Sequence, residues 1–280
     1  MAKADLHIHS NFSDGSDSVS DLVSKIKDTD ISIFALTDHD DIAGCIEIAG
    51  KIPSNIKFIP SIELTSTAKT IDCHILGFGC NPKDEVLNDL IQTGKKLRRE
   101  KTEKRIQFLH DKWGIDLTED EKEWLFSRRS PVKTHFANIL VNRGLSDNNV
   151  DAMKKYFDGC KTGKLRFDAQ KAVDAIVHSG GIPVWAHPLG GEGEEHISQT
   201  EFIEQLEIMK TIGIKGLECY YSRYSKDETE FLVVTAIQNN LLISGGSDYH
   251  GTNKTGIALA QLNTDNEFVD SQKLSVLNCL

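Results

Sequence analysis

The first nine residues contain the feature that most constrains the fold, the alternating run Asp5-Leu6-His7-Ile8-His9. Alternation with a period of two is typical of a β-strand, in which successive side chains point to opposite faces. His7 and His9 therefore share a face with Asp5, while Leu6 and Ile8 point into apolar packing. Two imidazoles on one strand face can bind a cation, because neutral imidazole is the commonest protein metal ligand. The alternative is a pair of ordinary surface histidines, and the rest of the chain decides between the two.

Further metal-competent residues are associated with short apolar runs along the chain. The residues at or just past the ends of such runs are His39, Glu63, His187, Asp248 and His250, and His74 lies inside another run. In a β/α barrel every strand directs its C-terminal loop to the same mouth, where active sites form. The placement of these residues therefore predicts a metal site assembled from several strands.

Composition limits the classes of protein to which the chain can belong. Its 280 residues are enough for one large barrel with an ample core. A formal net charge of −10 disfavours broad nucleic-acid binding, so no double-stranded DNA partner is expected. There is no apolar leader and no run of about eighteen apolar residues, so we expect a cytoplasmic protein with no membrane partner. The six cysteines lack CxxC spacing, which argues against a disulfide framework.

Strand and helix signals alternate over most of the sequence. Strands are expected at 3–9, 31–37, 57–64, 70–79, 182–187, 215–220 and 241–246. Between 83 and 164 the pattern contains only helices, at 84–113, 117–126, 131–142 and 147–157. The sequence thus predicts an α/β fold in which residues 1–82 and 165–280 form an irregular barrel. An open sheet is the alternative. Residues 83–164 are predicted to be an inserted all-α subdomain over the barrel mouth.

The ordered motifs resemble those of the PHP (polymerase and histidinol phosphatase) superfamily over nearly the whole chain. They are Asp-x-His-x-His at 5–9, Ser13-Asp14-Gly15, Thr37-Asp38-His39-Asp40, Glu63, His74, Ala186-His187-Pro188 and Ser247-Asp248-Tyr249-His250. The inserted helices and the stretch at 216–221 are similar to one branch of that superfamily. Its members are nucleotide phosphoesterases that act on nucleoside 3′,5′-bisphosphates, nucleoside monophosphates and short RNA 5′ ends. The resemblance implies a distorted (β/α)7 barrel, the PHP fold, with two to three divalent metal ions (Mn, Zn or Fe).

The resemblance also implies a set of nine metal ligands. The first metal is assigned to His7, His9 and Asp248, and Glu63 bridges it to a second. His74 and His187 complete the second site, and the third consists of Asp14, His39 and His250. Mixed imidazole and carboxylate ligands suit Zn, Mn or Fe better than Ca. A metal-activated water would then hydrolyse the phosphate ester without a protein nucleophile.

Catalytic roles are assigned to Glu63, as the bridge, and to Asp38. Asp38 either orients a ligand from behind or caps the helix that follows, and the sequence favours neither. The residues expected to contact substrate are Lys133, His135, Tyr221 and Arg223. Where the branch often has Arg-Pro-His, this chain has Lys133-Thr134-His135. Lysine binds phosphate as a point charge, whereas arginine binds it bidentately.

A basic stretch lies in the first helix of the insertion. Its cations are Lys95, Lys96, Arg98, Arg99, Lys101, Lys104 and Arg105. A solvated helix face is the favoured interpretation, and contact with substrate is the alternative.

Three functions remain open at this point. The favoured one is a metal-dependent phosphoesterase whose partner is a small phosphorylated substrate, a nucleotide or a short oligonucleotide. The insertion argues against the second, a histidinol-phosphate phosphatase. The complete ligand set argues against the third, a non-catalytic PHP scaffold.

Overall fold

The structure is a computed structural model that describes residues 2–128, 131–162, 166–191 and 196–280. Its strands are β1 Lys3–Asp5, β2 Ile31–Leu36, β3 Lys57–Ala68, β4 Ile71–Phe78, β5 Phe167–Asp168, β6 Ile182–Trp185, β7 Gly216–Tyr221 and β8 Leu242–Gly246. These form one sheet in the order β1-β2-β3-β4-β6-β7-β8, with β5 paired to β3 beside this path. The short β5, directly after the insertion, was not expected from the sequence.

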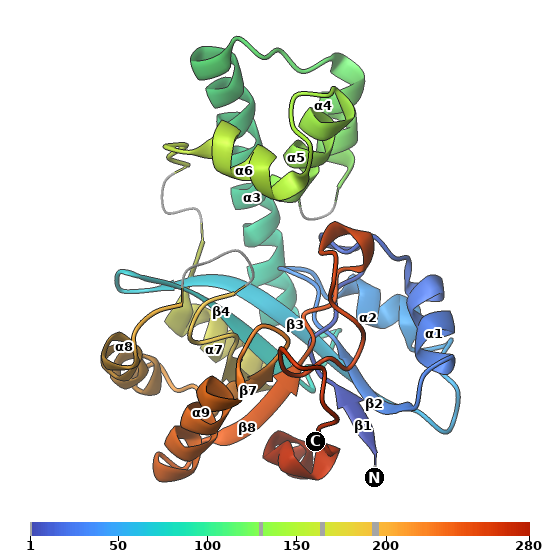
Figure 1. Ribbon diagram of the computed structural model, residues 1–280, viewed down its shortest axis with the longest axis vertical. Helices are drawn as coiled ribbons and strands as arrows, with labels where there is room; N and C mark the ends of the chain where they lie inside the picture. Colours follow the sequence, from blue (N-terminus) through green and yellow to red (C-terminus); the bar gives the residue numbers. More distant parts are fainter. Residues whose placement is uncertain (1, 129–130, 163–165, 192–195) are drawn as a thin grey trace.

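The α-helices in the described part of the chain fall into two groups. On the barrel lie α1 Val19–Lys27, α2 Ala43–Ile48, α7 Ala169–His178, α8 Gln199–Thr211 and α9 Lys226–Gln238. The insertion contains α3 Glu85–Trp113, α4 Glu119–Ser127, α5 Lys133–Asn142 and α6 Asn149–Phe157. The second group forms a separate helical unit above the sheet (Figure 1). The α/β fold with an inserted helical segment is thus as predicted.

The sheet is mixed, because β4 runs antiparallel to both of its neighbours, β3 and β6. The other neighbours along the path are parallel. As a consequence β3 does not end at Glu63, as the sequence suggested, but continues to Ala68 in a hairpin with β4. This hairpin pairs Thr65 with His74. His74 can therefore reach the same end of the sheet as Glu63 from inside a strand that runs the opposite way.

Backbone hydrogen bonds join the first strand to the last beyond their regular parts. The N–H of Leu6 donates to the carbonyl of Gly245 at 3.2 Å, and the N–H of Asp248 donates to the carbonyl of His7 at 2.8 Å. Ile8 and Tyr249 form an isolated parallel bridge. These bonds bring the two edges of the sheet together, as a barrel requires. The alternation of residues 5–9 therefore persists past β1, with Leu6 and Ile8 fully buried in the core.

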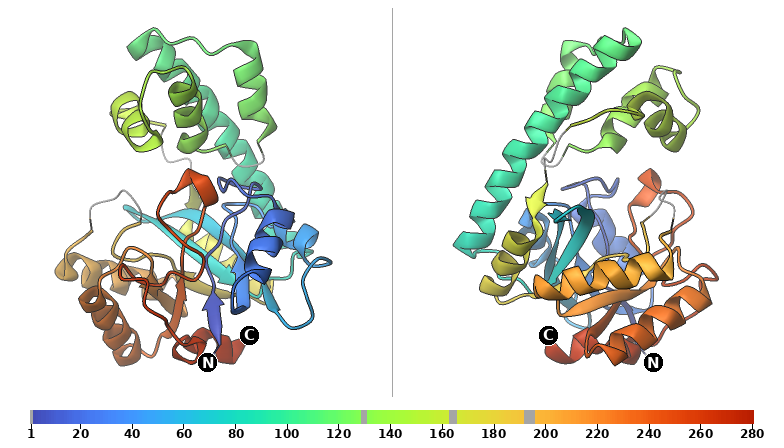
Figure 2. Two further views of the ribbon diagram at one scale, coloured as in Figure 1. Left: turned by 45° about the vertical axis from the view of Figure 1, so that its right-hand side comes forward. Right: turned by 90° about the vertical axis from the view of Figure 1, so that its left-hand side faces the viewer.

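Helix α3 connects two separate apolar clusters. Its first half contributes Leu87 and Ile91 to the main core between the sheet and the surrounding helices. Its second half contributes Leu109 to a smaller cluster within the insertion, together with residues such as Phe136 and Leu140 of α5. Figure 2 shows α3 as one continuous rod that extends from beside the sheet to the top of the helical unit. This helix thus fixes the insertion to the barrel.

The helices of the insertion begin at defined residues. A capping carboxylate, Asp84, begins α3 by accepting a hydrogen bond from the N–H of Leu87. Helix α5 begins at Lys133 rather than at Pro131, because His135 turns back to accept a hydrogen bond from the N–H of Val132. The predicted boundary at 164/165 lies outside the described residues. No helix in the described segments has the length and apolarity needed to cross a membrane.

Candidate metal centre

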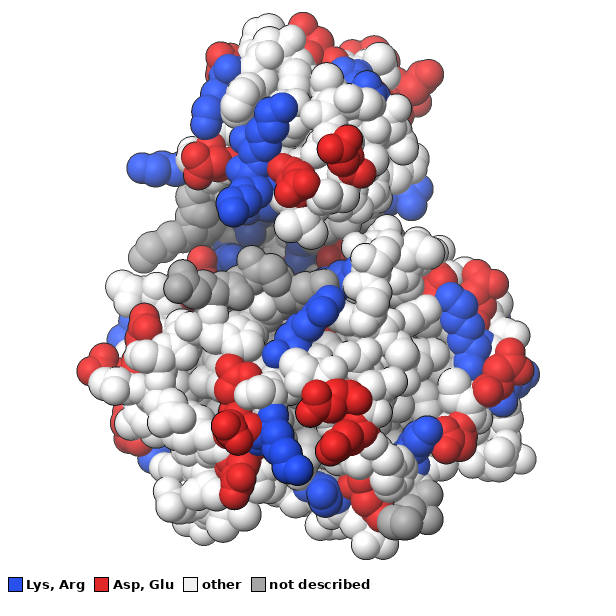
Figure 3. Space-filling view, viewed as in Figure 1, with Lys and Arg blue, Asp and Glu red and all other residues white. Residues whose placement is uncertain are grey.

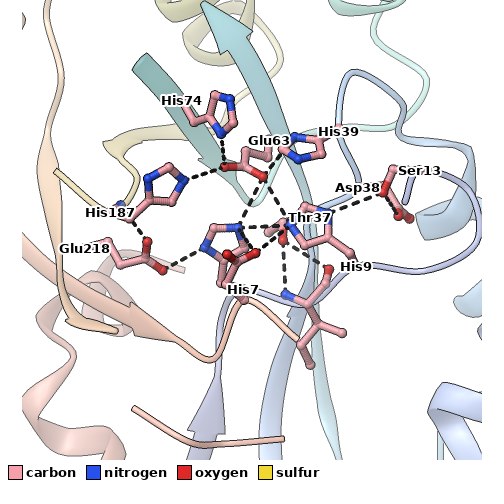
Figure 4. A network of polar contacts seen from close by, with 12 residues as sticks. His7, His9, Ser13, Thr37, Asp38, His39, Glu63, His74, His187 and Glu218 are labelled. Carbon is pink, nitrogen blue, oxygen red and sulfur yellow. Dashed lines mark hydrogen bonds and ion pairs between the residues drawn. The ribbon is translucent and has the colours of Figure 1, made fainter. Parts of the chain in front are cut away.

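Five imidazoles surround the buried carboxylate of Glu63 (Figure 4). They are supplied by the segment after β1, the loop after β2, strand β4 and the turn after β6. The distances to Oε2 are 3.3 Å from His7, 3.1 Å from His9 and 3.0 Å from His39. Oε1 lies 2.9 Å from His74 and 3.3 Å from His187. The two oxygens of one carboxylate therefore face two different sets of imidazoles, as a bridging ligand would.

The spacing at the first set fits the ligands of a single ion. His7 Nε2 and His9 Nε2 lie 3.1 Å apart, and each is 3.1–3.3 Å from Glu63 Oε2. Ligands of a tetrahedral zinc ion, at about 2.0–2.1 Å from it, are roughly 3.4 Å from one another. Oδ1 of Asp248 lies 3.5 Å from His7 Nε2 and 3.3 Å from His9 Nε2. The four predicted ligands of the first metal are thus together.

A second group gathers around Asp14. Its Oδ1 lies 3.1 Å from His250 Nε2 and 3.7 Å from His9 Nδ1, and Oδ2 lies 3.9 Å from His39 Nε2. A third group consists of His39, Glu63 and His74. Within each of these two groups, the metal-competent atoms lie within 4.8 Å of one another. The structure therefore brings all nine predicted ligands together. The groups share His9 and His39, so they overlap the three predicted sites without matching them member for member.

Four polar atoms of this cluster are buried without a hydrogen-bond partner in the described structure. They are Glu63 Oε2, His39 Nδ1, Asp14 Oδ1 and His250 Nε2. The pairs His39–Glu63 and Asp14–His250 approach to 3.0 and 3.1 Å, but their orientation is not that of a hydrogen bond. Buried polar atoms are almost always satisfied, so orphaned ligand atoms that converge fit bound cations. This imidazole–carboxylate set matches the preference of Zn, Mn or Fe.

Two opposing effects set the pKa values in the cluster: burial, and the attraction between imidazoles and carboxylates. Burial acts to raise the pKa of Glu63, but the imidazoles of His39 and His7 outweigh it and hold this pKa well below its usual range. Burial acts to lower the pKa of His9, yet the carboxylates of Asp248 and Glu63 raise it to about 9. The carboxylates are therefore ionised at neutral pH, which is the form that binds a metal.

Hydrogen-bond acceptors behind the predicted ligands form an outer layer that orients them. Glu218 accepts a hydrogen bond from Nδ1 of His7 at 2.8 Å and another from the N–H of His187 at 2.8 Å. Nδ1 of His250 lies 2.8 Å from the carbonyl of Asp248, which leaves Nε2 toward Asp14. Such partners select the tautomer of a ligating histidine. The sequence analysis did not single out Glu218, although a lone carboxylate in the apolar strand Gly216–Tyr221 was the available signal.

Asp38 lies in this outer layer and is almost fully buried. It accepts hydrogen bonds from the N–H and hydroxyl of Ser10 at 2.8 and 2.7 Å and from the hydroxyl of Ser13 at 2.6 Å. The hydroxyl of Ser13 in turn lies 3.3 Å from Nδ1 of His9. Helix α2 begins after Ile42 without a side-chain cap, so Asp38 does not cap it. Its position supports the first of the two predicted roles, with His9 as the ligand that it positions.

Two of the predicted ligands occupy backbone conformations that side chains rarely adopt. The φ angles of His187 and Asp248 are +27° and +56°. Such conformations cost of order 1–3 kcal/mol each and concentrate at functional sites. Here the surroundings hold them: Glu218 binds the N–H of His187, and the N–H of Asp248 is bonded to the carbonyl of His7.

The four residues predicted to contact substrate differ in their exposure. Tyr221 is fully buried, and its hydroxyl donates to Oδ2 of Asp248, a predicted ligand, at 2.9 Å. Arg223 is half-buried in the turn that follows β7, and Lys133 is exposed at the start of α5. His135 is buried, and burial lowers its pKa to about 4. The imidazole of His135 is therefore uncharged at pH 7 when no anion is bound beside it.

Comparison with known proteins identifies the family to which the chain belongs. A model of the PHP domain matches residues 5–164, more than half of the chain. The chain belongs to the PHP family. A 5′-3′ exoribonuclease of Haemophilus influenzae is 31% identical over 254 residues, which are 89% of this chain and 90% of that protein. A 3′,5′-nucleoside bisphosphate phosphatase of Chromobacterium violaceum is 27% identical, over 91% of this chain and 90% of that protein.

Two solved structures share the fold. An amidohydrolase from Chromobacterium violaceum aligns with a TM-score of 0.80 and 26% identity, over 90% of this chain and 88% of its own. A protein from Bifidobacterium adolescentis aligns with a TM-score of 0.78, at 24% identity, over 95% of this chain and 94% of its own. The predictions of a PHP protein and of a hydrolytic enzyme are thus confirmed.

Proposed function

We propose that this PHP protein is a metal-dependent nucleotide phosphoesterase, which removes phosphate from a nucleoside bisphosphate or monophosphate or acts on the 5′ end of a short RNA. The observation that supports it most strongly is the convergence of nine imidazole and carboxylate side chains, with Glu63 among them. The relatives named as a bisphosphate phosphatase and as exoribonucleases support the substrate class. Divalent ions held by this cluster would lower the pKa of a bound water toward neutrality and offset charge on the phosphoryl oxygens.

The chain's own residues supply binding and orientation. A cavity of about 80 Å³ lies directly over the centre, and its lining includes His39, His74, His187 and Lys254. Nζ of Lys254 donates to Oδ2 of Asp248 at 2.8 Å, so a cation stands at the wall of this cavity. An ammonium at this position attracts the phosphoryl group that is cleaved. Sequence reasoning did not single out Lys254.

A larger cavity of about 410 Å³ adjoins the centre. It is lined by His74 and His187 at one end and by residues of β4, β6 and α8. Arg166, just before β5, also lines it. The volume is in the range of ligand pockets. We assign this cavity to the part of the substrate that is not cleaved.

The test is a substrate panel offered to the protein as purified and after chelation. The panel contains adenosine 3′,5′-bisphosphate, adenosine 5′-monophosphate, a 5′-phosphorylated RNA trinucleotide and histidinol phosphate. We expect release of phosphate or mononucleotide from at least one nucleotide, at ten or more times the efficiency found with histidinol phosphate. Chelation should abolish it, and added Mn²⁺ or Zn²⁺ should restore it. A preference for histidinol phosphate, or no turnover of any ester with metal present, would overturn the proposal.

A further inference from the structure

Tyr249 lies between two predicted metal ligands in the sequence, Asp248 and His250, but its side chain makes its hydrogen bonds outside the predicted ligand set. Nε2 of His250 lies 3.1 Å from Oδ1 of Asp14, within the cluster. The hydroxyl of Tyr249 instead donates to Oδ2 of Asp17 at 2.9 Å. Tyr249 and Asp17 are each 9% exposed, so this contact is buried. A tyrosine hydroxyl and a carboxylate thus meet beside the segment that supplies two of the ligands.

Lys25 of helix α1 closes this contact into a set of three. Its Nζ donates to Oδ2 of Asp17 at 2.7 Å and to the hydroxyl of Tyr249 at 3.0 Å. Figure 3 shows charged side chains of both signs on the outer surface over α1, at the right of the view. The carboxylate of Asp17 is buried instead, and it accepts charge-assisted hydrogen bonds, which are stronger than those between neutral groups. Together, Asp17, Lys25 and Tyr249 form what we call the α1 clamp.

The α1 clamp joins two segments that each supply a ligand of the group around Asp14. Asp14 itself lies on the segment after β1, and His250 lies on the segment after β8. The N–H of Ser16 donates to the carbonyl of His250 at 3.0 Å, and the side-chain amide of Asn253 donates to the carbonyl of Asp14 at 2.8 Å. Because both acceptors are backbone carbonyls, these bonds dock the two segments together while the ligand side chains face each other.

Two glycines show how closely these segments are packed. Gly251 has a φ of +65°, and a Cβ there would overlap the hydroxyl oxygen of Ser16 and lie 3.2 Å from Cγ of Asp17. A Cβ at Gly15 would overlap the carbonyl oxygen of His9. The loop that contains Asp17 is thus packed tightly on both sides, and close-packed interiors transmit small displacements. A shift of the Asp17 carboxylate would therefore reach the ligand carboxylate three residues earlier in the chain.

From this arrangement we infer that the α1 clamp positions Asp14 against His250, so that the pair can hold one ion. The inference rests on the metal centre of the proposed function and not on the identity of the substrate. Oδ1 of Asp14 and Nε2 of His250 are buried and have no hydrogen-bond partner in the described structure. Residues that orient a ligand without touching the ion change metal affinity, typically by about 10–100-fold. The clamp should therefore set the affinity for an ion in the group around Asp14 and have little effect on the ions at Glu63.

Metal retention tests the clamp. The variants are Tyr249→Phe and Asp17→Asn, with Tyr156→Phe as the matched control, because the hydroxyl of Tyr156 also makes a hydrogen bond, to the carbonyl of Leu145 at 3.0 Å within the insertion. Each purified full-length chain is dialysed against a graded chelator series, and the metal it retains is counted by elemental analysis. In both clamp variants one ion per chain should be lost at an about tenfold lower chelator concentration than in the natural protein. The remaining ions, and all ions of the control, should be retained as in the natural protein.

A double variant tests whether the clamp acts as a unit. Oδ2 of Asp17 accepts the hydrogen bonds of both Tyr249 and Lys25, so removal of the tyrosine hydroxyl should matter little once that carboxylate is gone. We expect the loss of affinity in Asp17→Asn/Tyr249→Phe to be smaller than the product of the two single losses. Single losses that multiply in the double variant would show two independent effects and would overturn the clamp.

Thermal melting separates positioning from a general loss of stability. A metal that binds only the folded state stabilises it, so added Mn²⁺ should raise the Tm of the chelated natural protein and of Tyr156→Phe more than that of Tyr249→Phe. A lower Tm in metal-free Tyr249→Phe with unchanged metal retention would indicate a purely structural role and overturn the inference.

The same measurements separate this inference from the proposed function. If no nucleotide is hydrolysed and the clamp variants still lose one ion selectively, the proposed function fails while the clamp stands. Nucleotide hydrolysis with identical metal retention in all variants would support the proposed function and overturn the clamp.

Discussion

Glu218 and His7 form a buried pair in which the carboxylate lies 2.8 Å from Nδ1 of the imidazole. An ionised carboxylate only accepts hydrogen bonds, so Nδ1 carries the proton and Nε2 is left to face Glu63 and His9. The same carboxylate binds the N–H of His187, whose backbone is in a strained conformation. One residue thereby binds two predicted ligands, His7 and His187, on either side of Glu63.

Replacing this carboxylate tests its positioning role. A Gln at 218 has a single acceptor oxygen and can keep only one of the two hydrogen bonds. We expect Glu218→Gln to lower metal affinity or activity about 10–100-fold, the usual cost of losing such a partner. Metal content after dialysis against a graded chelator series provides the measurement. Glu207→Gln, at an exposed carboxylate of α8, is the control, and equal retention of metal by the two variants would contradict the assignment.

Burial, reinforced by nearby arginines, lowers the pKa of Lys101 to about 7, which predicts a gain in stability from its removal. Between pH 7 and pH 10.5 the unfolded chain binds more protons at this residue than the folded chain, so the stability of the natural protein rises with pH across that window. At pH 7 most of the free-energy cost of burying the charged Lys101 side chain is still present. Lys101→Met should therefore be more stable by at least about 1 kcal/mol, which corresponds to roughly 2–4 °C in Tm.

The pH dependence of that gain is the check. Thermal melting at pH 7 and pH 9 should show a gap between Lys101→Met and the natural protein that narrows at the higher pH. Lys96→Met should show no gap at either pH. A variant that is less stable at pH 7, or a gap that widens toward pH 9, would show that Lys101 is not a buried, unpaired cation.

Lys133 is expected to contribute to selection of the substrate. It acts electrostatically on Cys160, as Arg105 of α3 also does. A charge-assisted phosphate contact is worth about 1.5–3 kcal/mol, or roughly ten- to a hundredfold in kcat/KM. Lys133→Ala should lower kcat/KM for adenosine 3′,5′-bisphosphate by such a factor and affect p-nitrophenyl phosphate only weakly. Lys154→Ala, exposed on α6, is the control, and equal losses on both substrates would instead indicate a general defect.

The strand pattern was predictable from the sequence because it depends on local signals, whereas the full set of nine candidate ligands follows from the resemblance to the PHP superfamily. Alternation at residues 5–9 placed His7 and His9 on one face, and short apolar runs located the other strands. The direction of β4 was not predictable, because a hairpin and a crossover give similar apolar runs. For the same reason Glu63 was expected at the end of a strand, whereas it lies inside β3.

The sequence also does not predict which side chains of the insertion are buried. Residues 95–105 have the composition of a solvated helix, and only the packing of α3 against the barrel distinguishes Lys101 from Lys96. Tyr221 was expected to meet the substrate because it follows a strand near the site. In the structure its hydroxyl donates to Oδ2 of Asp248. Such distinctions depend on contacts between segments that are distant in the sequence, and the hydrophobic periodicity of a segment does not predict them.

The central claim is that Glu63 organises a multi-metal phosphoesterase centre, and metal analysis combined with kinetics of Glu63→Gln tests it most directly. Loss of this carboxylate removes a charge shared by five imidazoles, whereas His74→Asn removes one ligand at the edge. We predict two to three transition-metal ions per chain in the natural protein and a lower content in Glu63→Gln. The variant should also lose more phosphoesterase activity than His74→Asn. Full metal content with near-normal activity in Glu63→Gln would contradict the account.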